Sequence, residues 1–112
     1  MENLIVYQKM LETIQYAYIS LRQFPKSEKH ALGADIKNQM YAVLRLIIQA
    51  NKRYFKKTTM QDLDVEHEIF RKQIEMAKDL GFLPFKKFEI LSTKIDEVGR
   101  LIGAWKKKVG SG

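Results

Sequence analysis

The chain has 112 residues, no cysteine, 46% hydrophobic residues and a formal net charge of +7. This length fits one domain, and the hydrophobic content is that of a folded protein rather than a disordered chain. The absence of cysteine excludes a disulfide framework and a thiolate zinc site. The first ten residues lack the features of a signal peptide, and no apolar run reaches the ~18 residues of a membrane span. We therefore expect a cytoplasmic protein.

Apolar residues recur at helical spacing in four segments. The first helix is predicted to end before Pro25, because a proline disfavours the α conformation of the residue that precedes it. The second is predicted to begin at Ser27 as N-cap and to extend to Phe55 or Lys57, with Gly33 as a weak point or close-packing site. The apolar stripes are Leu4, Tyr7, Leu11, Ile14, Tyr18 and Leu21 in the first segment and Ile36, Met40, Val43, Leu44, Ile47 and Ala50 or Asn51 in the second.

Thr59, followed three residues later by an aspartate, has the spacing of a capping box at the start of a third helix. Gly81 is predicted to be the left-handed residue after that helix, and Pro84 to open the fourth. No segment alternates with period two, so the sequence predicts an all-α protein, an antiparallel up-down-up-down four-helix bundle over residues 1–108 with a flexible tail at 109–112. The later stripes are Leu63, Phe70, Ile74 and Ala77, then Phe88, Leu91, Ile95, Val98, Ile102 and Trp105.

No arrangement of catalytic residues is apparent in the sequence. The two histidines, His30 and His67, lie in no metal-ligand spacing. The carboxylates at residues 62–68 lack the Glu-x-x-His pairs of a di-metal bundle, so a solvated face that offsets the helix dipole is the preferred interpretation. The sequence thus predicts a protein that is not an enzyme and that holds neither a metal nor another cofactor.

Charge is distributed unevenly along the chain. Residues 26–57 carry eight Lys/Arg against two carboxylates, residues 58–83 three against six, and residues 84–112 seven against three. Because the second and fourth helices of such a bundle are parallel, the cations near their C-terminal ends are expected at one end of the molecule. This pattern predicts polyanion binding, and a solvated surface favoured by the helix dipoles is the alternative.

The candidate phosphate contacts fall into one main group and one further position. Arg45, in the middle of the second predicted helix, is either a phosphate contact or an intersubunit ion pair. A second basic group, at the opposite end, consists of Lys26, Lys29, His30, Lys86 and Lys87. The main candidates are Lys52, Arg53, Lys56, Lys57, Arg100, Lys106, Lys107 and Lys108.

Gly99 and Gly103 lie beside the apolar stripe of the fourth predicted helix. Each glycine costs about 1 kcal/mol of helix stability relative to alanine, so both are expected at close contacts, either within the bundle or between subunits. The surplus of large aromatic side chains predicts an exposed patch of the kind that marks protein interfaces. Trp105, Tyr16 and Tyr54 are the aromatic candidates for such core or oligomer contacts.

The junction of the first two helices resembles a known family. Phe-Pro-Lys-Ser-Glu-Lys at residues 24–29, with Leu32, Gly33 and Ile36, is similar to this junction in the four-helix-bundle family of ribosomal-RNA intervening-sequence proteins. That family includes the accessory variability determinants of diversity-generating retroelements. Residues 77–81 and 95–105 resemble the accessory branch in particular. Residues 47–52 depart from the Ser-Asn-Ile-Ala-Glu-Gly-like stretch of the intervening-sequence branch, which also favours the accessory branch.

The resemblance implies a homo-oligomeric, pentameric barrel of basic bundles without catalytic activity. It also implies that the partners are the retroelement's reverse transcriptase and nucleic acid, chiefly template-repeat RNA, with DNA as the alternative. Such proteins support adenine-directed mutagenic reverse transcription. Two other interpretations remain: a bundle of the intervening-sequence type, and a protein-interaction scaffold without nucleic-acid binding. A peripheral membrane binder is disfavoured, because the cations cluster at helix ends rather than along one amphipathic face.

Overall fold

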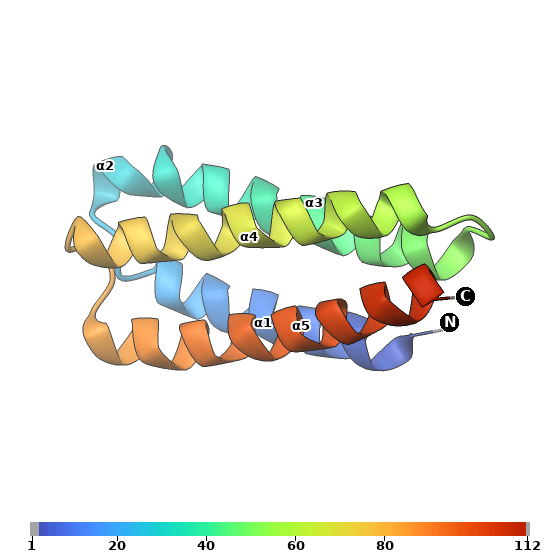
Figure 1. The fold of residues 1–112 in the computed structure, drawn as a ribbon. Helices are drawn as coiled ribbons and strands as arrows, with labels where there is room; N and C mark the ends of the chain where they lie inside the picture. Colours follow the sequence, from blue (N-terminus) through green and yellow to red (C-terminus); the bar gives the residue numbers. More distant parts are fainter. Residues whose placement is uncertain (1–2, 112) are drawn as a thin grey trace.

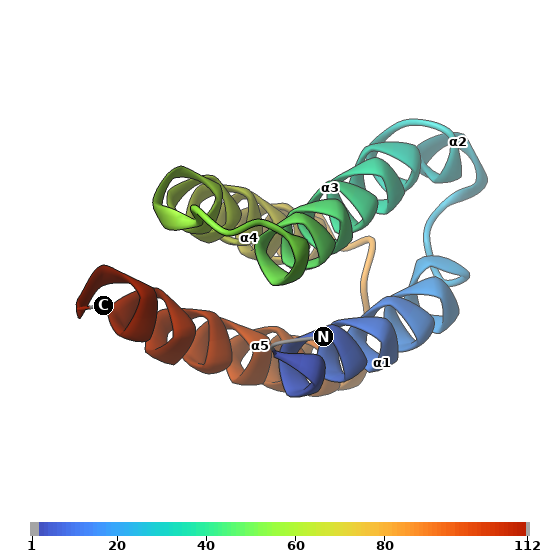
Figure 2. The ribbon, with the colours of Figure 1, turned by 90° about the vertical axis from the view of Figure 1, so that its right-hand side faces the viewer.

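Four long helices and one single-turn helix make up the computed structural model, which describes residues 3–111 (Figure 1). They form an elongated bundle of 46 × 22 × 20 Å in which α1 lies beside α5 and α3 beside α4 (Figure 2). The described residues contain no strand, and the prediction of an all-α bundle is confirmed. The barrel assembly stays a prediction. The helices are α1 (Leu4–Leu21), α2 (Lys26–Lys29), α3 (Leu32–Lys52), α4 (Lys57–Asp79) and α5 (Phe85–Ser111).

The predicted second helix is interrupted near its start, so the prediction of one continuous helix is wrong. Ala31 has φ −112° and ψ −100°, which separates α2 from α3. A Cβ on Gly33 would lie 3.1 Å from the Glu28 carbonyl oxygen, so this glycine lets α2 fold closely onto the first turn of α3. Its prediction as a close-packing site is confirmed. Ser27 lies inside α2, whose N-cap is Pro25, so the N-cap prediction is wrong.

The connection between α3 and α4 lies earlier in the chain than the sequence predicts. Arg53 adopts an extended conformation and ends α3 at Lys52, so the predicted continuation to Phe55 or Lys57 is wrong. Because α4 already begins at Lys57, Thr59 lies in its first turn and is not an N-cap. The Thr59 hydroxyl instead accepts a hydrogen bond of 2.9 Å from the Arg53 guanidinium. The capping-box prediction is therefore wrong.

The C-terminal end of α4 follows the sequence prediction. Gly81 has φ +80°, the left-handed conformation that favours glycine. The Phe82 N–H donates to the Ala77 carbonyl and the Gly81 N–H to the Lys78 carbonyl, at 2.9 and 3.0 Å. These two bonds form the Schellman motif that satisfies the last carbonyls of a helix.

The last helix is longer than expected. It begins at Phe85, one residue after the predicted start at Pro84, which is within the usual uncertainty of helix ends. It continues through Ser111, and Val109 packs half-buried against the core. The structure thus places three residues of the expected tail, 109–111, in a helix, whereas Gly112 lies outside the described residues. The domain boundary at residue 108 stays a prediction.

The core confirms most of the stripes in α3, α4 and α5, but only Ile14 and Leu21 of the one in α1. In α1 Leu4 is exposed and Tyr18 half-exposed, whereas Thr13, Ala17 and Ser20 are buried. The buried hydroxyls donate to carbonyls four residues earlier in the helix, so these small polar residues pack without a loss of hydrogen bonds. Small residues therefore share the inward face of α1 with larger apolar ones. Its buried apolar residues are Val6, Met10, Ile14, Ala17 and Leu21.

A buried histidine on α4 packs closely against Gly99 of α5. His67 is 4% exposed and packs edge to face on Phe70, with 6.5 Å between ring centroids. A Cβ on Gly99 would lie 3.1 Å from His67 Cε1 and 2.9 Å from an Arg71 guanidinium nitrogen. Burial, and secondly the positive charge of Arg71, lowers the pKa of His67 to about 4. Its imidazole is therefore neutral in the folded protein at pH 7.

This pKa predicts a loss of stability in acid. Between pH 6.5 and pH 4 the unfolded chain binds a proton at residue 67 that the folded protein excludes, so the free energy of unfolding falls as pH falls. We expect this group alone to lower it by about 3 kcal/mol between pH 7 and pH 4. Urea unfolding of the wild type and of His67→Leu at both pH values measures the difference. His30→Gln, at an exposed histidine, is the control, and an equal acid sensitivity of all three proteins would contradict the prediction.

Candidate nucleic-acid interface

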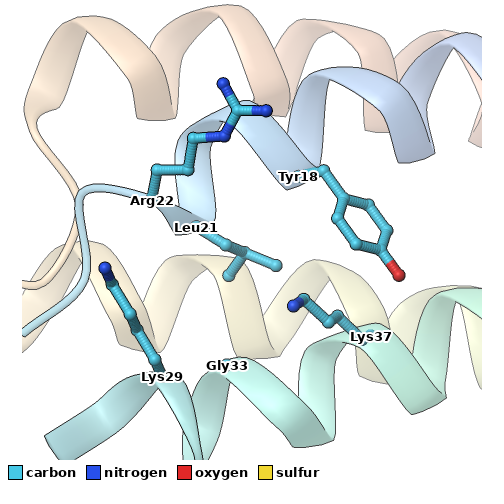
Figure 3. A pocket seen from close by; sticks show the side chains of 6 residues that line it. All are labelled: Tyr18, Leu21, Arg22, Lys29, Gly33 and Lys37. Atoms are coloured by element: carbon cyan, nitrogen blue, oxygen red, sulfur yellow. The ribbon is translucent and has the colours of Figure 1, made fainter. Parts of the chain in front are cut away.

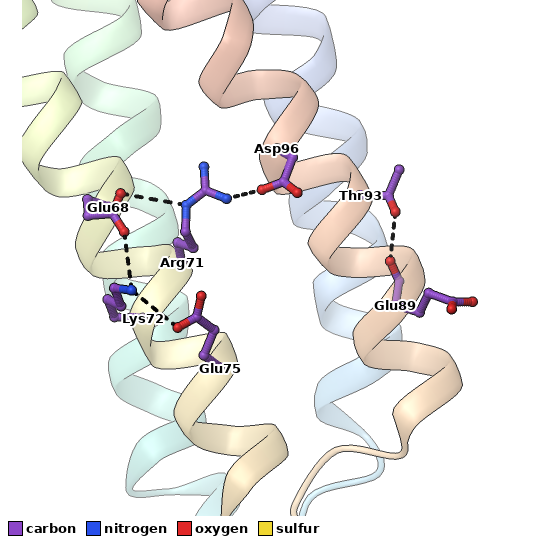
Figure 4. Close-up of polar contacts among 7 residues, drawn as sticks. All are labelled: Glu68, Arg71, Lys72, Glu75, Glu89, Thr93 and Asp96. Atoms are coloured by element: carbon purple, nitrogen blue, oxygen red, sulfur yellow. Dashed lines mark hydrogen bonds and ion pairs between the residues drawn. The ribbon is translucent and has the colours of Figure 1, made fainter.

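The carboxylates in the middle of α4 are held in ion pairs (Figure 4). Arg71 contacts Asp96 on α5 and Glu68 on its own helix, the latter at 3.6 Å. Lys72 lies 3.9 Å from Glu68 and 3.4 Å from Glu75. Glu68 and Glu75 are thus paired with cations of their own helix, and the Arg71–Asp96 pair joins α4 to α5.

Two further carboxylates of α4 contact the neighbouring helices. Asp64 accepts a 3.0 Å ion pair from Lys106 on α5, and Glu66 accepts a 2.6 Å hydrogen bond from Gln39 on α3. The first turn of α4 contains no acidic residue. The prediction that these side chains offset the helix dipole is therefore wrong. Within residues 3–111 no group of three or more histidines and carboxylates is placed to hold a metal ion.

The candidate cations at the α3–α4 connection and those near the C-terminus of α5 lie at one end of the bundle, which we call the basic end. The α3–α4 connection and the C-terminus of α5 meet there (Figure 1). A groove of ≈110 Å³ is lined by Lys57 and Met60 from α4 together with Lys106 and Val109 from α5. Folding thus brings together positively charged residues that are about 50 positions apart in the sequence. The basic end consists of Lys52, Arg53, Lys56, Lys57, Lys106, Lys107 and Lys108.

These cations differ in their partners. Arg53 is bonded to the Thr59 hydroxyl, and the Lys56 ammonium donates to the Ala50 carbonyl at 2.7 Å. Lys106 is paired with Asp64, so a carboxylate balances this member of the cluster. Lys52 and Lys57 are exposed, and no carboxylate in the described part of the chain pairs with either. These two lysines flank the connection and are therefore available to an external anion.

Arg45 and Arg100 are exposed but lie away from the basic end. Arg45 precedes Lys52 by seven residues, which corresponds to about 10 Å along α3. Arg100 precedes Lys106 by six residues, or about 9 Å along α5. The structure thus places these two arginines on the sides of the bundle.

The candidates for packing contacts lie in four different environments. Trp105 is 3% exposed in the core, and Tyr16 is half-buried with the Lys87 ammonium 5.6 Å from its ring centroid. A Cβ on Gly103 would meet no described atom within 4 Å, in contrast to the crowded Gly99. Tyr54 lies in the α3–α4 connection and is 89% exposed. Of these residues, only Gly99 and Trp105 are packed tightly within one bundle.

A second cationic hollow lies at the opposite end, between α1, α2 and α3 (Figure 3). Arg22, Lys29 and Lys37 line this space of ≈180 Å³, and no carboxylate lines it. The Lys37 ammonium lies 4.8 Å from the ring centroid of Tyr18. Sequence reasoning placed Lys29 at this end but missed the other two cations. The sequence feature that could have indicated Arg22 and Lys37 is Pro25, because the turn there brings the end of α1 beside the start of α3.

A sequence model of the bAvd-like family matches residues 4–109, a range that includes α1 to α4 and all but the last two residues of α5. The chain belongs to the bAvd-like family. These proteins are accessory variability determinants of retroelements, an accessory and non-catalytic kind of protein. The resemblance to the accessory branch is thereby confirmed. No curated protein matches the chain.

The range of the bAvd-like match and the extent of the helical bundle nearly coincide. The family match begins at the first residue of α1 and ends two residues before the last residue of α5. Among the described residues, no helix is long and apolar enough to cross a membrane.

Proposed function

We propose that this bAvd-like protein supports mutagenic reverse transcription by binding the retroelement's reverse transcriptase and its template RNA, and that the basic end contacts the RNA. The observation that carries the proposal is the distribution of charge. No acidic residue occurs between Asp35 and Asp62, a segment that contains six Lys/Arg. Four of these six lie at the α3–α4 corner, beside the lysines that end α5.

Lysines suit the RNA backbone better than they suit a defined base sequence. An ammonium group acts as a point charge toward phosphate oxygens, and contacts to phosphate position a nucleic acid without reading its bases. The proposal therefore requires binding that depends on the charge of the basic end and is nearly independent of RNA sequence. DNA is the alternative nucleic acid, and an acidic protein surface is the alternative partner.

A charge-neutralising variant tests this function. We expect Lys52→Gln combined with Lys57→Gln to weaken binding of unrelated single-stranded RNAs about tenfold, or ~0.7 kcal/mol for each cation. These lysines are exposed, so the fold is retained. Fluorescence anisotropy with labelled RNA of two unrelated sequences is the measurement.

The matched control removes two charges at the other end of the bundle. Lys26→Gln combined with Lys86→Gln changes the net charge equally, and both residues are exposed. An equal loss in both double variants would indicate an effect of net charge alone and would contradict the basic end as the interface. A loss limited to one RNA sequence would contradict backbone binding.

We further propose that the protein assembles into a homo-oligomer, with α4 at the subunit contact. Val65, Ile69, Met76 and Leu80 are 58%, 41%, 51% and 56% exposed. Their spacing of four, seven and four residues places them on one face of α4, away from the buried stripe. A helix that is apolar on two faces needs a second partner. The pentamer that we expect is the state implied by the family.

Charges in this stripe should prevent the assembly. We expect Ile69→Glu combined with Met76→Glu to convert the oligomer into a monomer of 13.2 kDa with an unchanged helical content, because two carboxylates would be buried without partners at the contact. Light scattering measures the mass. Phe85→Glu, which changes a residue that is 67% exposed but outside the stripe, is the control. A double variant that keeps the wild-type oligomeric mass would exclude α4 from the contact.

A further inference from the structure

Two aromatic side chains project from the α3–α4 corner. Tyr54 and Phe55 are 89% and 86% exposed, more than any other large hydrophobic side chain that the structure describes. Their rings lie edge to face, with 4.9 Å between centroids and 87° between planes. Aromatic side chains contribute to stability through burial, and these two contribute almost none. Their exposure therefore points to a binding role rather than to the fold.

The corner that carries these rings is held in place on both sides. Before the rings, the Arg53 N–H donates to the Gln49 carbonyl at 2.9 Å, and the Arg53 guanidinium reaches across the corner to Thr59 at 2.9 Å. After the rings, the Lys56 ammonium donates back to the Ala50 carbonyl at 2.7 Å. Two cations thus close a loop of four residues between α3 and α4. A braced loop loses less conformational entropy when a ligand binds to it.

The charges around the rings indicate the chemistry of the ligand. Lys52 and Lys57 flank the corner without carboxylate partners, and no acidic residue precedes Asp62 in this part of the chain. The matching ligand combines negative charge with flat unsaturated faces. Single-stranded nucleic acid has this combination, since its phosphates pair with cations while its unpaired bases stack on aromatic rings. In a duplex the bases are already stacked on each other.

We propose that Tyr54 and Phe55 form a stacking platform for unpaired RNA bases, while the neighbouring lysines hold the phosphates. This inference rests on the proposed function and specifies its ligand as single-stranded rather than duplex RNA. Each ring has a face that is not covered by the other, so the corner offers a stacking surface to a base on either side. The alternative occupant is an apolar groove of the reverse transcriptase, which the experiment distinguishes.

The test is the variant Tyr54→Leu combined with Phe55→Leu, which keeps apolar volume at the corner but removes the aromatic faces. We expect binding of single-stranded RNA to weaken about 5- to 100-fold, the effect of losing one stacked base. Binding of an RNA duplex should not change, and neither should the dependence of single-strand binding on salt, because the phosphate contacts remain. Phe85→Leu, at an exposed ring near the opposite end, is the control and should bind as the wild type does.

The other outcomes separate this platform from the proposed function. If the wild type binds RNA and the double variant binds it equally well, the platform is wrong and the function stands. A parallel loss of duplex binding also overturns the platform, because a duplex offers no unpaired base. Loss of reverse transcriptase binding with RNA binding intact assigns the rings to the protein partner and overturns the platform. If the wild type binds neither single-stranded nor duplex RNA, the proposed RNA-binding function and the platform both fail.

Discussion

The pairing of the acidic residues of α4 determines where the positive charge of this molecule is effective. Arg71 joins α4 to Asp96 on α5, and Lys106 on α5 pairs with Asp64. These contacts pair carboxylates along the side of the bundle with cations, and Arg71 also lies beside Gly99, next to His67. Lys52 and Lys57 have no such carboxylate partner among the described residues, so their positive charge is not offset where they lie.

The ends of the helices then decide which cations can act. At the α3–α4 corner, Arg53 and Lys56 are bound to the protein itself, and they stabilise the loop rather than face a ligand. Lys52 and Lys57 remain exposed beside Tyr54 and Phe55. The corner thus combines a braced backbone, available charge and exposed aromatic rings, three properties that together suit single-stranded RNA.

Periodicity in the sequence predicts the helical class and the core faces of α3, α4 and α5, because large aliphatic residues mark those faces clearly. It succeeds only in part for α1, where Ile14 and Leu21 are buried as predicted, but Thr13, Ala17 and Ser20 also face inward. The cap patterns in the sequence also fail at two helix starts, because neither Ser27 nor Thr59 is an N-cap in the structure.

Grouping of the cations at the two ends follows from the alternating helix directions and was predictable. The partners of individual cations were not, because they depend on side-chain contacts across helices. Lys106 shows this, since its pairing with Asp64 joins residues 42 positions apart. The aromatic surplus did predict an exposed patch that includes Tyr54, but not the place of Tyr54 in a loop, because the sequence predicted that the second helix extends to Phe55 or Lys57.

The most direct test of this account is the salt dependence of single-stranded RNA binding by the wild-type protein. Each phosphate that a lysine neutralises lowers the slope of log affinity against log salt by about 0.7. Contacts from three or more lysines of the basic end therefore predict a slope of about −2 or steeper. A flat dependence, or no binding at low salt, would contradict the account, because the cations of the basic end would then not contact phosphates.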